Sequence, residues 1–78
     1  MKEVNEVRVS RKGWRTTVVF SDGSKDVIPF DSFLRCFGDY RRSVYEYMTY
    51  VFVSLSSRDR SDLAHEAVKE IKAKLLPR

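Results

Sequence analysis

The chain of 78 residues has few of the residues on which small secreted or catalytic proteins depend. It contains one cysteine, one histidine, three glycines and two prolines. A single cysteine, Cys36, excludes an intramolecular disulfide framework and is typical of a reducing compartment. The N-terminal residues lack the apolar stretch of a signal peptide, and no run approaches the roughly 18 apolar residues of a membrane span. We therefore expect a soluble, cytoplasmic protein with no membrane partner.

Recognisable catalytic and cofactor motifs are also missing. His65 has no cysteine or second histidine at zinc-binding spacing. There is no phosphate-binding glycine loop, nucleophile elbow or dinucleotide fingerprint, and Asp22 and Asp26 belong to a predicted hairpin. Cys36 beside Phe37 is typical of a buried structural thiol. The sequence thus predicts a non-enzymatic protein without a metal or a cofactor.

Enough apolar and aromatic material is present for a folded chain. The hydrophobic residues make up 42% and the aromatic residues 13%, which argues against disorder. At this length we expect one domain, residues 1–78, whose core alone gives marginal stability. A partner or a second copy of the chain would add buried area.

The segment FSDGSK is the clearest local signal and predicts a β-hairpin. Asp22 and Gly23 are typical of a two-residue loop, which would place Val18 opposite Val27. Another hairpin, the first along the chain, is predicted in the segment RKGW. The three expected strands cover residues 4–10, 14–20 and 25–29.

The predicted loop of this first hairpin consists of Lys12 and Gly13 and pairs Val9 with Thr16. Because side chains alternate along a strand, the two hairpins together sort the meander into two faces. One face is apolar and comprises Val7, Val9, Trp14, Val18, Phe20 and Val27. The other face is largely polar and comprises Glu6, Arg8, Ser10, Arg15, Thr17, Val19, Asp26 and Ile28.

Capping residues predict two or three helices after the meander. Pro29 ends the third strand, and Asp31 can cap a short helix, SFLRCF, which Gly38 closes. Asp39 can cap a second helix and Ser61 a last one. The last helix shows apolar residues at helical spacing, namely Leu63, Ala67, Ile71 and Leu75. The expected fold class is α+β, with a three-stranded antiparallel β-meander packed against two or three C-terminal helices.

The segment YRRSVYEYMTYVFV, residues 40–53, holds all four tyrosines. As a helix that continues to Leu55, it has one broad apolar arc. The arc comprises Tyr40, Val44, Tyr47, Met48, Val51, Phe52 and Leu55. A helix is the favoured interpretation, because Asp39 can cap it. A strand over 47–55 is the alternative, because Tyr, Thr, Val and Phe also suit strands.

On the helix interpretation, Tyr45, Tyr50 and Val53 lie outside the core arc. Either the last helix packs against them, or they form a contact surface, since Tyr and Arg are enriched at binding hot spots. The candidate protein-partner surface comprises Arg41, Arg42, Tyr45 and Tyr50.

The N-terminal hairpin carries most of the candidate anion-binding groups. The net charge of the chain is +4, and no acidic residue occurs from Val7 to Ser21. Arg and Lys on a sheet or β-ribbon can contact phosphates, and Thr hydroxyls can add hydrogen bonds. The candidate contacts to nucleic acid or to an acidic partner are Arg8, Arg11, Lys12, Arg15, Thr17 and Lys25. A solvated sheet face is the plain alternative.

Residues 7–50, with the motif GWRTTVVFSDGSK followed by a helix, resemble the small three-stranded DNA-binding domains of phage integrases and of certain plant transcription factors. Those domains read DNA with the face of the sheet. The resemblance implies that Arg8, Arg15 and Thr17 contact DNA.

The whole chain, from its initiating Met to the end KLLPR, also resembles the short free-standing proteins of phages and mobile elements. Many of these, including anti-CRISPR proteins, are stoichiometric inhibitors. The first functional hypothesis is therefore a small non-enzymatic inhibitor or modulator that binds a host protein or nucleoprotein complex. A direct DNA- or RNA-binding module is the second hypothesis, and a homodimeric structural protein whose tyrosine surface pairs with itself is the third.

Overall fold

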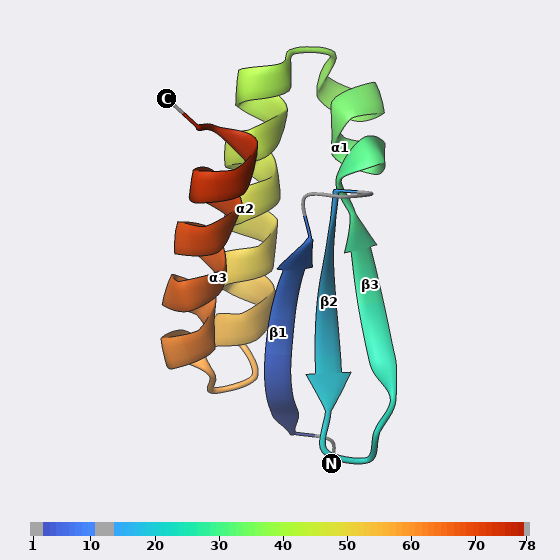
Figure 1. Ribbon diagram of the computed structural model, residues 1–78, viewed down its shortest axis with the longest axis vertical. Coiled ribbons are helices and arrows are strands. Elements are labelled where there is room, and N and C mark those ends of the chain that lie inside the picture. Colours follow the sequence, from blue (N-terminus) through green and yellow to red (C-terminus); the bar gives the residue numbers. More distant parts are fainter. Residues whose placement is uncertain (1–2, 11–13, 78) are drawn as a thin grey trace.

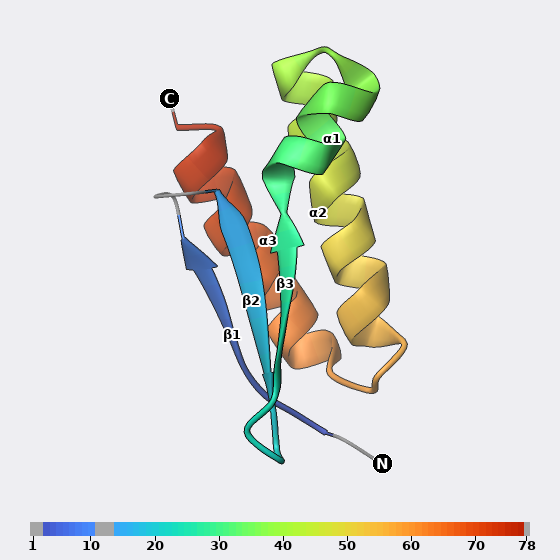
Figure 2. The same ribbon diagram turned by 90° about the vertical axis from the view of Figure 1, so that its right-hand side faces the viewer.

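The computed structural model, which describes residues 3–10 and 14–77, is an α+β fold of two layers (Figures 1 and 2). A three-stranded antiparallel sheet in the order β1-β2-β3 is followed by three helices, and α2 and α3 lie side by side on one of its faces. The elements are β1 (Val4–Ser10), β2 (Arg15–Phe20), β3 (Lys25–Pro29), α1 (Phe30–Phe37), α2 (Tyr40–Ser56) and α3 (Ser61–Leu75). None of the helices in the described ranges is long and apolar enough to cross a membrane.

The pairing of β1 with β2 confirms the register predicted for the first hairpin. Val9 lies opposite Thr16 and Val7 opposite Val18. The predicted loop, Lys12 and Gly13, lies outside the described residues. A register shift between Val4 and Glu6 bends the far end of β1, so that Val4 pairs with Phe20.

The second hairpin differs from its prediction by one residue. Its loop has three residues, because the Phe20 N–H donates to the Ser24 carbonyl at 2.9 Å and the Gly23 N–H to the Phe20 carbonyl at 3.0 Å. Gly23 adopts a left-handed φ of 88°. The Asp22 carboxylate accepts hydrogen bonds from the Ser24 N–H and from the Ser24 hydroxyl, which holds this longer loop.

The extra loop residue reverses the two faces of β3. Val18 now pairs with Asp26, and Val27 pairs with Thr17. A shift of one residue exchanges the faces of a strand, so the predicted placement of Val27 on the apolar face is wrong. Asp26 and Ile28 face the helices instead.

The core lies between the sheet and the pair α2 and α3. Its fully buried side chains include Val4 and Phe30 at opposite ends, with Val44, Tyr47, Val51 and Leu55 from α2 and Ala64 and Ile71 from α3. Inside it the Tyr47 hydroxyl donates to the Ile28 carbonyl and lies 2.8 Å from the hydroxyl oxygen of Thr16. This contact ties α2 to β2 through two buried hydroxyls and to β3 through the partly buried Ile28 carbonyl.

The helical interpretation of the tyrosine segment is confirmed, and two of the four predicted helix ends hold. Asp39 caps α2 through its carboxylate, which accepts the Arg41 N–H at 3.1 Å. Gly38 ends α1 with a left-handed φ of 74°. The predicted side-chain caps of the other two helices are wrong, because Pro29 precedes α1 and Arg60 precedes α3, and neither side chain caps its helix.

Candidate functional site

The uncovered face of the sheet is the first candidate surface, and it brings together the predicted anion-binding residues of the strands. By the observed registers Arg8, Arg15, Thr17 and Lys25 all point away from the helices. Arg11 and Lys12 lie outside the described residues. Three rows cross this face: Glu6, Val19 and Lys25; Arg8, Thr17 and Val27; and Ser10, Arg15 and Pro29.

The charges on this face are only partly free. Arg8 forms a two-pronged ion pair with Glu6, at 2.9 and 3.3 Å. The hydrogen bond and the opposite charge of the partner lower the pKa of Glu6 and raise the pKa of Arg8. Arg15 and Lys25 form no ion pair with another described residue. The rim of the face is thus cationic, and its centre holds Thr17 and two valines.

The outer face of α2, defined by Arg42, Tyr45, Thr49, Tyr50 and Val53, is the second candidate surface. Tyr45, Tyr50 and Val53 keep 44%, 54% and 59% of their surface exposed. Helix α3 lies beside α2 rather than over it, so it does not bury them (Figure 1). The interpretation that the last helix covers these side chains is therefore wrong for the described structure.

Neighbouring aromatic rings hold parts of the outer face of α2 in place. The Arg42 guanidinium lies over the ring of Phe37, 5.3 Å from its centre. Tyr50 meets Phe33 of α1 edge to face, with the ring centres 5.5 Å apart. Arg41, the remaining predicted residue, is the second residue of the same helix and is exposed. These contacts pre-order the side chains, which reduces the entropy lost on binding.

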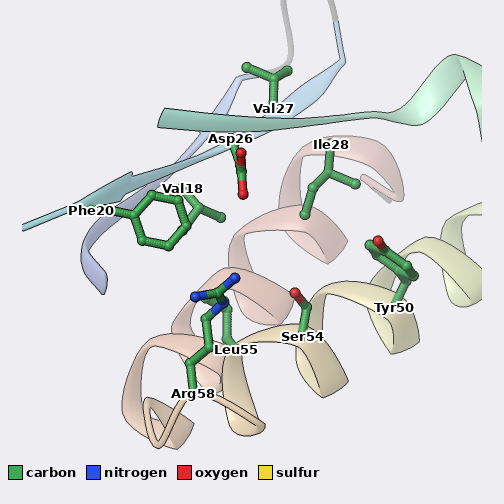
Figure 3. A pocket seen from close by; sticks show the side chains of 9 residues that line it. All are labelled: Val18, Phe20, Asp26, Val27, Ile28, Tyr50, Ser54, Leu55 and Arg58. Atoms are coloured by element: carbon green, nitrogen blue, oxygen red, sulfur yellow. The ribbon is translucent and has the colours of Figure 1, made fainter. Parts of the chain in front are cut away.

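Two hollows flank α2. A shallow apolar groove of about 240 Å³ runs between α2 and α3, lined by Tyr45, Met48, Thr49, Phe52 and Val68. A cleft of about 260 Å³ separates α2 from the sheet, and its lining includes Asp26, Ile28, Tyr50, Ser54 and Arg58. Figure 3 shows Asp26 and Ile28 pointing into this cleft, while Val27 points to the opposite side of the strand.

The single cysteine and the single histidine of the chain are both exposed. Cys36 is exposed, so the predicted buried thiol is wrong. His65 is exposed and meets the ring of Phe52 edge to face at 5.0 Å. Across the described ranges, no group of three His, Cys, Asp or Glu side chains could hold a metal ion.

Sequence reasoning missed Val27 on the outer sheet face and the polar cleft. The signal for Val27 was the loop segment itself, which permits a two-residue or a three-residue hairpin. For Arg58, which the sequence places in a polar loop, no signal indicated its contact with the ring of Phe20, at 4.9 Å.

No protein-family model matches the chain, and neither a curated protein nor a solved structure matches it significantly. The resemblance to three-stranded DNA-binding domains therefore stays a prediction.

Proposed function

We propose that this chain is a small non-enzymatic binding protein that docks on an acidic, partly apolar surface of another protein through the outer face of α2. The supporting observation is the exposure of Tyr45, Tyr50 and Val53 on one helix face. A chain this small has little apolar surface to spare, because its core must be assembled from few residues. Large side chains left half exposed are typical of a binding surface.

Charge supports an acidic partner. Arg41 and Arg42 stand at the start of the outer face of α2, and neither forms an ion pair with a described carboxylate. Tyr45 and Tyr50 supply rigid area with a polar tip, which suits a hot spot.

The positions of the two candidate surfaces argue against the hypothesis that one partner contacts both of them. The sheet face and the outer face of α2 point in opposite directions, so one flat partner cannot contact both.

Truncation of Tyr45 tests this proposal. Tagged wild-type chain and the variants Tyr45→Ala and Arg42→Ala would be compared for the partner that co-purifies with them. We expect each truncation to weaken the complex about 30-fold, the effect of losing a hot-spot contact of about 2 kcal/mol. The melting temperature should stay within about 2 °C, because both side chains are on the surface.

Arg15→Ala is the matched control, since it removes a guanidinium from the opposite face. A partner that is retained by Tyr45→Ala but lost with Arg15→Ala would contradict the assignment to α2. A large fall in melting temperature for Tyr45→Ala would show instead that the side chain stabilises the core.

Nucleic-acid binding by the sheet is the second candidate function, and the uncovered face with Arg8, Arg15 and Lys25 favours it. A mobility shift with duplex DNA or RNA at low salt is the expected result. The shift should weaken steeply as salt rises, because each phosphate contact adds about 0.9 to the slope of the logarithmic salt plot. The double variant Arg8→Ala/Arg15→Ala should lower that slope by about 2.

Arg42→Ala is the control for this second candidate, because its guanidinium lies on the far side of the molecule. It should leave the shift unchanged. The absence of any shift at low salt would exclude direct nucleic-acid binding and leave the protein partner as the function.

A further inference from the structure

The two edges of the sheet differ in what lies beside them. At the β1 edge, α3 lies alongside, and one cation of this helix and one directly before it satisfy backbone carbonyls of β1. The Arg60 guanidinium donates to the Val4 carbonyl and the Lys74 ammonium to the Val9 carbonyl, each at 2.5 Å. At the β3 edge no described element lies beside the strand (Figure 1).

The backbone of β3 presents hydrogen-bonding groups to this open edge. Phe20 and Ser24 form a hydrogen-bonded pair at the hairpin. Hydrogen-bonded pairs alternate in an antiparallel ladder, so Asp26 and Ile28 turn their backbone groups toward β2. The N–H and C=O groups of Lys25 and Val27 therefore point outward, as does the C=O of Pro29.

We propose that β3 pairs with β3 of a second copy of this chain, antiparallel and centred on Val27, to give a continuous six-stranded sheet. The twofold axis of an antiparallel pair can pass through a hydrogen-bonded or a non-hydrogen-bonded pair, so every residue of β3 is a candidate for it. An axis at Lys25 or at Asp26 would oppose two like charges. An axis at Ile28 or at Pro29 would put Pro29, which has no N–H to donate, into the central hydrogen-bonded pairs. Val27 has both backbone groups and an uncharged, β-branched side chain that suits a cross-strand pair.

The charges on the surrounding rows are compatible with this register. Lys25 falls opposite Pro29 of the second copy, so no like charges meet across the new ladder. The two Lys25 side chains are four residues apart along the strands, about 13 Å, which exceeds the screening length at physiological salt. The central row reads Arg8, Thr17 and Val27 and then continues in reverse into the second copy.

Burial supports the same contact. Val27 keeps 49% of its surface exposed in the single chain although it lies in a strand. Ile28, which is partly buried, points into the cleft beside α2, and Tyr50 borders the same cleft (Figure 3). Ile28 of the second copy would lie opposite Asp26 at the mouth of this cleft. A chain with a marginal core gains buried area from such a contact.

The mass of the chain in solution tests the proposal. Light scattering on a sizing column should give twice the 9.2 kDa of one chain. Val27→Lys places two ammonium groups opposite each other on the twofold axis. The dissociation constant of the dimer should therefore rise by at least about tenfold. Val53→Lys is the matched control. It is the same substitution at a valine of similar exposure on α2, and it should leave the dimer intact.

Hydrogen exchange gives a second measurement that needs no variant. The Val27 N–H should be protected at high protein concentration and exchange freely on dilution. The exchange rate of the Tyr47 backbone N–H should not depend on protein concentration. A monomer at about 1 mM would overturn the proposal and leave the β3 edge free for a strand of another protein. A dimer that survives Val27→Lys, with circular dichroism showing an intact fold, would overturn it as well.

The dimer and the proposed function can be tested independently of each other. Val53→Lys alters the outer face of α2 and should weaken the partner complex while the mass stays doubled. Val27→Lys should instead halve the mass in solution and leave the partner complex intact. A dimer that binds no partner would therefore contradict only the proposed function.

Discussion

Replacing Phe30 with alanine is expected to lower the free energy of unfolding by about 3–5 kcal/mol, the usual cost of emptying a buried aromatic site. Phe30 has 0% of its surface exposed. Its ring meets those of Trp14, Tyr40 and Tyr47 edge to face, at centre distances of 5.5, 5.6 and 5.4 Å. The side chain thus joins the end of the sheet to α1 and α2, and no neighbour can fill its place without moving.

Such a loss approaches the whole stability of many domains of this size. Denaturant unfolding at low temperature is the appropriate measurement, with Phe30→Leu as a variant that keeps part of the volume. Phe37→Ala is the matched control, because Phe37 ends the same helix and is only partly buried. Equal losses for Phe30→Ala and Phe37→Ala would contradict the central place given to Phe30.

The first hairpin could be predicted because its register rests on two independent signals. A loop at Lys12 and Gly13 places Val9 opposite Thr16. The alternation of Val7 and Val9 with polar residues independently puts both valines on the face that this register requires. The second hairpin has only one signal. The residues at its tip permit a loop of two or three residues, and the choice depends on hydrogen bonds from Ser24 to Asp22 that the sequence does not reveal.

That single residue decides part of the candidate site. With the three-residue loop Val27 moves to the uncovered face, where it is the centre of the proposed dimer contact. Arg8, Arg15 and Thr17 keep their predicted face because they belong to the first hairpin. The shared face of Arg8, Arg15 and Thr17 could therefore be predicted from the sequence, and the place of Val27 on that face could not.

On α2 the pattern of the sequence identified the buried arc but not what lies opposite it. Periodicity separates Val44 and Val51 from Tyr45 and Val53. Whether α3 lies over or beside the outer face depends on long-range contacts. Arg60 and Lys74 hold α3 against β1 through carbonyls 56 and 65 residues away, and no local rule predicts such pairs.

The second large effect is expected for the Tyr47 hydroxyl. Tyr47→Phe should lower the free energy of unfolding by about 1–3 kcal/mol, because it leaves the Ile28 carbonyl and the buried Thr16 hydroxyl without this partner. The melting temperature should fall by about 4–8 °C for each kcal/mol. Tyr45→Phe removes an exposed hydroxyl and should change the free energy by less than about 0.5 kcal/mol. Equal effects of the two variants would contradict a buried bridge at Tyr47.

The same hydroxyl makes stability fall at alkaline pH. Burial raises the pKa of Tyr47 above its ordinary value of 10.0, although the hydrogen bond with Thr16 opposes part of the rise. The folded state then holds its proton more tightly than the unfolded state, so this contribution is complete below pH 10 and is lost as the pH rises toward the folded pKa. The difference in unfolding free energy between wild type and Tyr47→Phe should be constant up to about pH 9 and shrink by about pH 11. Because the other titrating groups cancel in this difference, a constant gap across that range would mean that the hydroxyl ionises as freely in the folded chain as in the unfolded one.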